Sequence, residues 1–351
     1  MNKVRQISLC TAGLLPLAHS NAQASQEQAQ RPNVVFIFTD DHAANAISAY
    51  NKTLLKTPNM DRLAEEGMVF DNCFATNSIS TPSRATILTG KHSHMNGVPI
   101  FNEFDGSQQT FPKLLQQAGY STAMIGKWHL TSDPTGFDYW EIFPGQGQYY
   151  NPIMYTKDGG TRYKGGYATN LVADKTIEFI ENAPKDKPFF VMSQHKAPHR
   201  PFQPRPDLRE KYKDRTFPLP ETFWDDYATR EAALKDNKMA LSNSFTNNDL
   251  KLTPPPGLPA DSLAKWLATS PQELVVDGRK LTGRELIQYK YNRYMQDYLA
   301  CVEAVDESIG QVLDYLKKTG LDKNTIVIYS SDQGFFLGEH GLFDKRYMYE
   351  E

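Results

Sequence analysis

The sequence predicts an α/β protein in which helices cover both faces of a mixed, mostly parallel sheet. Continuous apolar runs, such as residues 33–38 and 324–331, are typical of strands that are buried on both faces. Segments with helical periodicity separate these runs, and this alternation favours parallel strands joined by crossover helices. The chain has 351 residues, 40% of them hydrophobic, which is enough for a large core.

The first 24 residues have the pattern of a secretory signal peptide. Lys3 and Arg5 precede an apolar stretch over residues 7–18, and a small-x-small cleavage site ends at Ala24. The apolar stretch is too short to span a bilayer, and no other segment is long and apolar enough to do so. We therefore expect a signal peptide over residues 1–24, a linker over 25–31, export across the inner membrane to the periplasm, and no transmembrane anchor.

The further elements follow from apolar runs and from helix boundary signals. Pro58 lies in the first turn of an expected helix that stops at Gly67. Other segments with clear periodicity are expected to be strands over residues 68–75, 121–125 and 188–193 and helices over residues 111–117, 168–181 and 286–318.

Two stretches interrupt this alternation. Residues 133–162 are rich in Gly, Pro and aromatic side chains, and residues 201–280 carry many prolines and charges. Both are too long for simple connections, so we expect functional loops over one face of the sheet, the second an insertion into a domain that spans residues 32–351. For residues 241–259 a disordered insertion is the alternative.

Charge and cysteine content exclude several classes of partner and framework. A formal net charge of −3 gives no reason to expect a nucleic acid or an anionic membrane as a partner. Only Cys73 and Cys301 lie beyond the predicted signal peptide. Two distant cysteines form neither a disulfide framework nor a zinc motif, so core packing is expected for both.

Oxygen ligands follow two of the predicted buried strands. Asp40 and Asp41 come after the first, and Asp332 and Gln333 follow the run that ends at residue 331. In open α/β sheets ligands bind beyond the carboxyl ends of strands. Adjacent carboxylates repel each other unless a cation lies between them, and an all-oxygen set suits Ca²⁺ or Mg²⁺. Taken alone, however, the Asp40-Asp41 pair is more simply explained as a loop cap.

Cations and imidazoles follow the other strands. Lys127 and His129 come after one predicted strand, His195 and His199 after another, and Lys345 lies near the end of the chain. Each residue taken singly could be an ordinary surface or core side chain. Their occurrence at every strand end predicts a site that holds an anion against a metal ion.

The segment over residues 78–90 can be read in two ways. Its small hydroxyl residues, proline and apolar run are typical of a helix start, with Ser80 as a possible cap. The run Ser80-Thr81-Pro82-Ser83-Arg84 also resembles the Cys/Ser-x-Pro-Ser-Arg signature of the type I sulfatase family, within the alkaline phosphatase-like superfamily. Residues 38–41, 126–129 and 331–334 resemble the other motifs of this family, in the same order.

The resemblance implies that Ser80 is a reagent. In this family the residue is oxidised to formylglycine, whose hydrate carries two hydroxyls. One attacks sulfur and expels the alcohol; deprotonation of the other releases sulfate and restores the aldehyde. The resemblance further implies one divalent cation, usually Ca²⁺ with Mg²⁺ possible, and the following ligands: Asp40, Asp41, the modified Ser80, Asp332 and Gln333.

The same resemblance assigns the remaining site residues. Arg84 would support the hydrate and the metal, and His129 would assist deprotonation of the hydrate. Lys127, His199 and Lys345 would bind the sulfate, with His199 or Lys345 as general acid for the leaving oxygen. His195 would line the substrate pocket or pack in the core.

The substrate class also follows from resemblance. Residues 334–351 and 220–227 resemble secreted bacterial sulfatases that act on glycans, and N-acetylglucosamine 6-sulfate is the favoured substrate. Tyr149, Tyr150 and Trp224 would stack on sugars or pack within loops. A serine at the modified position implies an oxygen-independent, serine-type maturase as a partner before export.

Two alternatives to an active sulfatase stay open, and the first of them depends on where the chain ends. Family members continue past Glu351 with further strands and a C-terminal subdomain, so we expect this chain to lack that subdomain. One alternative is therefore a truncated, inactive glycan-binding protein. The other is a metal-dependent phosphoesterase of the same superfamily, with an unmodified serine as nucleophile.

Overall fold

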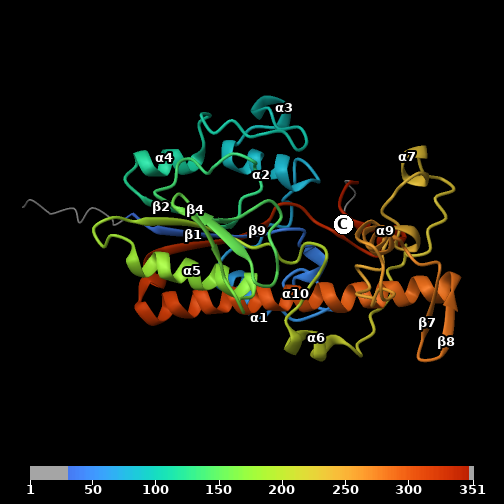
Figure 1. Ribbon diagram of the computed structural model, residues 1–351. Coiled ribbons are helices and arrows are strands. Elements are labelled where there is room, and N and C mark those ends of the chain that lie inside the picture. Colours follow the sequence, from blue (N-terminus) through green and yellow to red (C-terminus); the bar gives the residue numbers. More distant parts are fainter. Residues whose placement is uncertain (1–30, 348–351) are drawn as a thin grey trace, which may run out of the picture. The chain divides into compact units, whose positions relative to one another are not determined.

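A mixed seven-stranded sheet forms the centre of the part of the chain that the computed structural model describes, residues 31–347 (Figure 1). The strand order is β5-β4-β3-β2-β6-β1-β9. Neighbours in the run β3-β2-β6-β1-β9 pair in parallel, and β4 and β5 add an antiparallel edge. The bounds are β1 Asn33–Thr39, β2 Ser121–Lys127, β3 Tyr139–Phe143, β4 Ile153–Thr156, β5 Gly159–Arg162, β6 Phe189–Gln194 and β9 Thr325–Ser331.

Successive residues of the central strands pack on opposite faces of the sheet, as the side-chain period of a strand requires. The long helices are α1 Pro58–Glu66, α2 Ser80–Thr89, α4 Phe111–Gln117, α5 Ala168–Asn182 and α10 Gly283–Thr319. In β1, Val35 and Ile37 join a large core cluster with residues of α5 and α10, whereas Val34 and Phe36 contact a second cluster that includes residues of α2. Helices therefore lie on both faces (Figure 1). This is the predicted α/β arrangement.

Shorter elements lie mainly in the long connections. The insertion predicted over residues 201–280 contains short helices and a two-stranded hairpin rather than a bare loop. The bounds are η1 Ala44–Ala46, α3 Ser93–Asn96, α6 Pro206–Tyr212, α7 Ala232–Lys235, α8 Leu241–Ser244, α9 Ala260–Ala268, β7 Glu273–Val276, β8 Arg279–Thr282, η2 Leu321–Asn324, β10 Phe336–Leu337, η3 Glu339–Gly341 and β11 Phe343–Asp344.

Several local expectations are wrong. Residues 68–75 form no strand, and Met68 and Phe74 are exposed. Residues 133–162 contain β3, β4 and β5 and so extend the sheet instead of only covering it. Residues 241–259 are ordered, because Asn247 ties this segment to α9 by hydrogen bonds to Trp266 and Thr269.

The cysteines and the N-terminal prediction have separate outcomes. Cys301 is buried in α10, as expected, but Cys73 is exposed, so core packing is wrong for it. The predicted signal peptide over residues 1–24, and the predicted linker up to residue 30, lie outside the described residues. Within residues 31–347, no helix has the length and apolar character needed to cross a membrane.

Candidate active site

The predicted site residues converge where β1, β2, β6 and β9 end and α2 begins. Ser80 is the first residue of α2, and its Oγ donates a hydrogen bond of 2.8 Å to Asp40 Oδ1, directly after β1. Ser80 and Asp40 are both buried. The N-terminus of a helix favours negative charge, because its first N–H groups are unpaired and its dipole is positive there. The serine hydroxyl thus lies between a carboxylate and a position suited to an anion.

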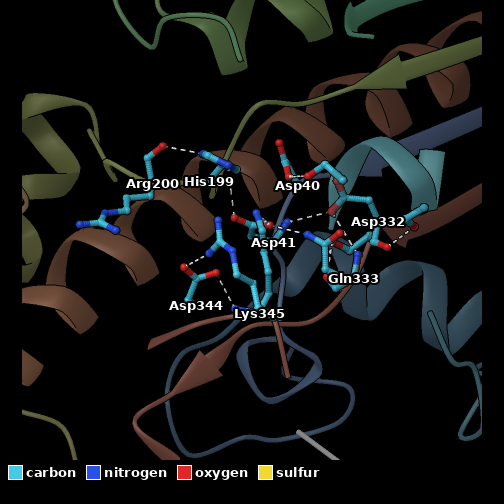
Figure 2. A network of polar contacts seen from close by, with 12 residues as sticks. Asp40, Asp41, His199, Arg200, Asp332, Gln333, Asp344 and Lys345 are labelled. Atoms are coloured by element: carbon cyan, nitrogen blue, oxygen red, sulfur yellow. Dashed lines mark hydrogen bonds and ion pairs between the residues drawn. The ribbon is translucent and has the colours of Figure 1, made fainter. Parts of the chain in front are cut away.

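Asp41 is the centre of the polar network in Figure 2. Its Oδ1 accepts hydrogen bonds from Gln333 Nε2 and from Lys345 Nζ, and its backbone N–H donates to Asp332 Oδ1 at 3.1 Å. Its Oδ2 and Gln333 Oε1 are buried acceptors that have no hydrogen-bond donor among residues 31–347. Burial raises the pKa of Asp41 to about 7, against the opposing charge of Lys345.

The buried oxygen atoms around Asp41 are suited to a bound cation. Two ammonium groups already approach the aspartates, Lys345 at Asp41 and Lys127 at Asp40. The unpaired acceptors on Asp41 and Gln333 are hard oxygens of the type that Ca²⁺ and Mg²⁺ prefer. Atoms of Asp40, Asp41 and His199 lie within 4.8 Å of one another and could hold a metal ion. The residues present therefore fit a divalent cation.

Arg84 joins the carboxylates to the neighbouring strands. Its Nη2 lies 3.1 Å from Asp332 Oδ2 and 3.9 Å from Asp40 Oδ2. Its Nη1 donates to the backbone oxygen of Lys127 at 2.7 Å and to the Gln194 side chain. The guanidinium is buried one turn into α2, where its planar set of donors can serve several acceptors at once.

Two basic groups lie beside this cluster after β2. Lys127 is fully buried, and burial holds the pKa of its ammonium well below the ordinary value. Burial, followed by the charges of Lys127 and Arg84, lowers the pKa of His129 to about 3. The His129 imidazole is therefore neutral at neutral pH. Its Nδ1 lies 3.4 Å from Thr81 Oγ1, so it faces the first turn of α2.

The two histidines after β6 have different surroundings. His199 lies at the edge of the aspartate cluster, with Nε2 3.7 Å from Asp41 Oδ2 and Nδ1 2.6 Å from the backbone oxygen of Arg200 (Figure 2). Burial and nearby lysine charges hold the pKa of His199 well below its ordinary value. His195 is buried, its Nδ1 has no hydrogen-bond partner among the described residues, and burial lowers its pKa to about 3.

The chain adopts positive φ angles at two of the strand ends. Asp41 has φ 65° and His129 has φ 58°, in the left-handed region that non-glycine residues rarely adopt. Strand β2 ends at Lys127, so His129 does not continue the extended strand. Such backbone is characteristic of sites where the direction of a side chain matters more than local stability.

Sequence reasoning missed three polar side chains that support the site. Gln194 accepts from Arg84, Gln146 Oε1 accepts from Lys127 Nζ at 2.5 Å, and Ser83 Oγ donates to the backbone oxygen of Asp332. Gln194 is the last residue of β6, so the rule that located Asp40 would also have located it. Gln146 lies in an irregular connection and has no comparable signal.

The aromatic residues considered for sugar stacking are not equivalent. Tyr149 is buried, and its hydroxyl donates to the backbone oxygen of His199 at 2.7 Å, so it supports the loop. Tyr150 and Trp224 are each 38% exposed. The guanidinium of Arg284 lies 4.9 Å from the centre of the Trp224 ring and already occupies one of its faces.

Comparisons with known proteins agree with the motifs. The family model described as "Sulfatase" matches residues 32–351. An N-acetylglucosamine-6-O-sulfatase of Bacteroides thetaiotaomicron is 49% identical, over 96% of this chain and 65% of its own length. The human N-acetylglucosamine-6-sulfatase is 25% identical, over 92% of this chain and 54% of its own length.

A solved structure shows the same fold with a sugar bound. The structure of BT4656 in complex with its substrate D-glucosamine-2-N,6-O-disulfate matches with a TM-score of 0.84 and 48% identity, covering 92% of this chain and 69% of that one. The chain thus spans less than two thirds of the length of both curated relatives.

Proposed function

Because the chain belongs to the sulfatase family, we propose that it hydrolyses sulfate esters of a glycan, with N-acetylglucosamine 6-sulfate as the substrate type. The substrate assignment rests on the 49% identical relative, an N-acetylglucosamine-6-O-sulfatase, and on the sulfated glucosamine bound in BT4656. The observation that carries the proposal is the position of Ser80, buried at the start of α2 and hydrogen-bonded to Asp40.

In this proposal a serine-type maturase oxidises Ser80 to formylglycine before export. Hydrated formylglycine supplies a nucleophile together with a second hydroxyl for sulfate release. Asp40, Asp41, Asp332, Gln333 and the modified side chain would hold one divalent cation, Ca²⁺ or Mg²⁺, which would offset negative charge on the sulfate oxygens. The contacts of Arg84 with Asp332 and Asp40 would fix the carboxylates around this cation.

The other basic groups divide into anion binding and proton transfer. Lys127 and Lys345 approach the two aspartates from different elements, and so would bind the sulfate from two sides. The imidazole of His129, which faces the first turn of α2 next to Ser80, would accept the proton that leaves the hydrate. His199 or Lys345 would give a proton to the departing sugar oxygen. His195 would support the wall of the site from the core.

Location and domain limits belong to the same proposal. The catalytic domain would span residues 32–351, with the insertion over 201–280, and a signal peptide over residues 1–24 would direct it to the periplasm. A sulfated glycan would then meet the enzyme outside the cytoplasm.

Sulfate release tests the proposal directly. The chain, co-produced anaerobically with a serine-type maturase, is incubated with N-acetylglucosamine 6-sulfate, and inorganic sulfate is measured. We expect release that stops in Ser80→Ala and continues in Ser78→Ala, because the Ser78 hydroxyl is exposed and donates to the backbone oxygen of Arg346. Faster hydrolysis of N-acetylglucosamine 6-phosphate, or sulfate release that survives Ser80→Ala, would contradict the proposal.

A further inference from the structure

A tight turn delivers Lys345 to the aspartate cluster. Strands β10 and β11 form a short antiparallel hairpin whose connecting turn covers residues 338–342, and Lys345 directly follows β11. Gly338, His340 and Gly341 all have positive φ, at 103°, 54° and 69°. His340 is the non-glycine residue among them, so this turn is costly unless outside contacts hold it.

A single segment, residues 222–227, supplies such contacts to His340. Thr222 Oγ1 accepts from the His340 N–H at 3.1 Å, and the hydroxyl of Tyr227 donates to the His340 backbone oxygen. The imidazole Nδ1 lies 2.7 Å from Asp225 Oδ2. The backbone donor, the backbone acceptor and the ring of one residue are therefore all bound by one neighbouring segment.

Asp225 is itself held in place for this contact. Arg230 donates to the same carboxylate, with Nη2 3.0 Å from Oδ2. The N–H of Tyr227 donates to Asp225 Oδ1 at 2.8 Å. Charge-assisted hydrogen bonds of this kind are roughly twice as strong as neutral ones, so the carboxylate has a fixed direction when it meets the imidazole.

Packing leaves the turn little freedom to move relative to this segment. A Cβ on Gly341 would lie 3.0 Å from the backbone oxygen of Phe223, and a Cβ on Gly338 would lie 2.6 Å from the Tyr291 ring. Beyond the turn, the N–H of Phe343 donates to the backbone oxygen of Met239 at 3.0 Å. The hairpin is thus fixed from the turn to the residue two positions before Lys345.

We propose that Asp225 and Tyr227 are positioning residues, which hold the His340 turn and thereby place the Lys345 ammonium against Asp41. They touch none of the predicted reacting groups and act through His340. The consequence for catalysis rests on the proposed function, in which Lys345 binds the sulfate. The placement of the ammonium itself can be measured without any turnover.

The first test measures the accessibility of Lys345. Its side chain is 8% exposed and paired with Asp41, so it should react slowly with acetic anhydride. In Asp225→Asn the turn loses a charged hydrogen bond, and we expect acetylation of Lys345 to quicken about tenfold, as read by peptide mass spectrometry. Asp226→Asn is the matched control, because this neighbouring aspartate is exposed and accepts a hydrogen bond from the N–H of Ala228, away from His340.

The second test separates positioning from general damage to the fold. If Asp225 acts through Lys345, then Asp225→Asn should lower kcat/KM about tenfold in the wild-type background and have no further effect on Lys345→Met. Tyr227→Phe should behave in the same way, and Thr222→Ser should retain the activity that Thr222→Val loses.

Three results would overturn the inference. One is equal acetylation of Lys345 in Asp225→Asn and Asp226→Asn. Another is a double variant, Asp225→Asn with Lys345→Met, whose fold loss in kcat/KM equals the product of the losses of the two single variants. The last is slower acetylation in Asp225→Asn than in the wild type. Because acetylation needs no substrate, the inference can survive or fail separately from the sulfatase proposal.

Discussion

Replacement of Arg84 by lysine tests whether the guanidinium holds the carboxylate cluster together. Arg84 contacts Asp332, Asp40, the backbone oxygen of Lys127 and the Gln194 side chain from one buried position. A lysine ammonium keeps the charge but is a compact donor without the planar fork. It can stay near Asp332, and it cannot also serve the two acceptors that Nη1 now serves.

The expected loss of stability follows from those two acceptors. A buried polar group left without a partner costs about 1–3 kcal/mol, so two such groups in Arg84→Lys should lower the free energy of unfolding by about 2–6 kcal/mol. That is a large share of the roughly 5–15 kcal/mol that stabilises a typical domain. Arg62 is a matched control, because its pair with Asp314 is largely exposed and Arg62→Lys should cost less than about 0.5 kcal/mol.

Urea unfolding followed by tryptophan fluorescence measures both variants. The midpoint should fall for Arg84→Lys with the denaturant slope unchanged, since the folded core is the same. If Arg84→Lys lowers the free energy of unfolding no more than Arg62→Lys does, then the guanidinium is not what holds the strand ends together.

Further predictions concern the cation, a close backbone approach and a buried imidazole. Added Ca²⁺ should raise the unfolding temperature of the wild type but not of Asp41→Asn, by an amount that grows with concentration; an equal rise in both would contradict the proposed ligand set. Gly126→Ala should lower the free energy of unfolding by roughly 3 kcal/mol or more, because the new Cβ would lie 1.9 Å from the backbone oxygen of residue 194 and the backbone φ is +98°. Gly257 also has a positive φ but has open space around it, so Gly257→Ala should lower this free energy by only about 1–2 kcal/mol. Burial lowers the pKa of His195 to about 3, so the unfolded chain binds this proton first as pH falls below about 6.5, and stability is lost between those values. Between pH 7 and 4.5 the free energy of unfolding of the wild type should fall by about 3 kcal/mol more than that of His195→Gln. His92 is exposed, so His92→Gln should lose as much as the wild type when both are measured by chemical denaturation.

The strand ends were predictable from sequence because two simple signals coincide there. A continuous apolar run marks a strand buried on both faces, and in a parallel sheet such strands present their next residues at one edge. Asp40, Lys127 and Asp332 were located in this way, although they are far apart in the chain. The left-handed backbone at Asp41 and His129 was not predictable, because tertiary contacts impose it.

Two hairpins of the structure lie in stretches that were predicted to be loops. Asp277 and Gly278 connect β7 and β8, and both have positive φ, as a two-residue type I′ turn requires. The Asp-Gly pair is a strong hairpin signal that was present in the predicted insertion. Residues 157 and 158 connect β4 and β5 in a stretch whose glycines and prolines obscured its strands. For residues 68–75 the opposite error occurred, because apolar character alone predicted a strand that has no pairing partner in the described chain.

Fragment mass spectrometry of the tryptic peptide over residues 63–84 shows whether Ser80 is converted to formylglycine. The protein should be co-produced anaerobically with a serine-type maturase, and the peptide compared with the same peptide made without it. We expect that Ser80 loses one pair of hydrogens and becomes the aldehyde, and that no other residue of the peptide changes. An intact Ser80 in protein made with an active maturase would contradict the proposed nucleophile.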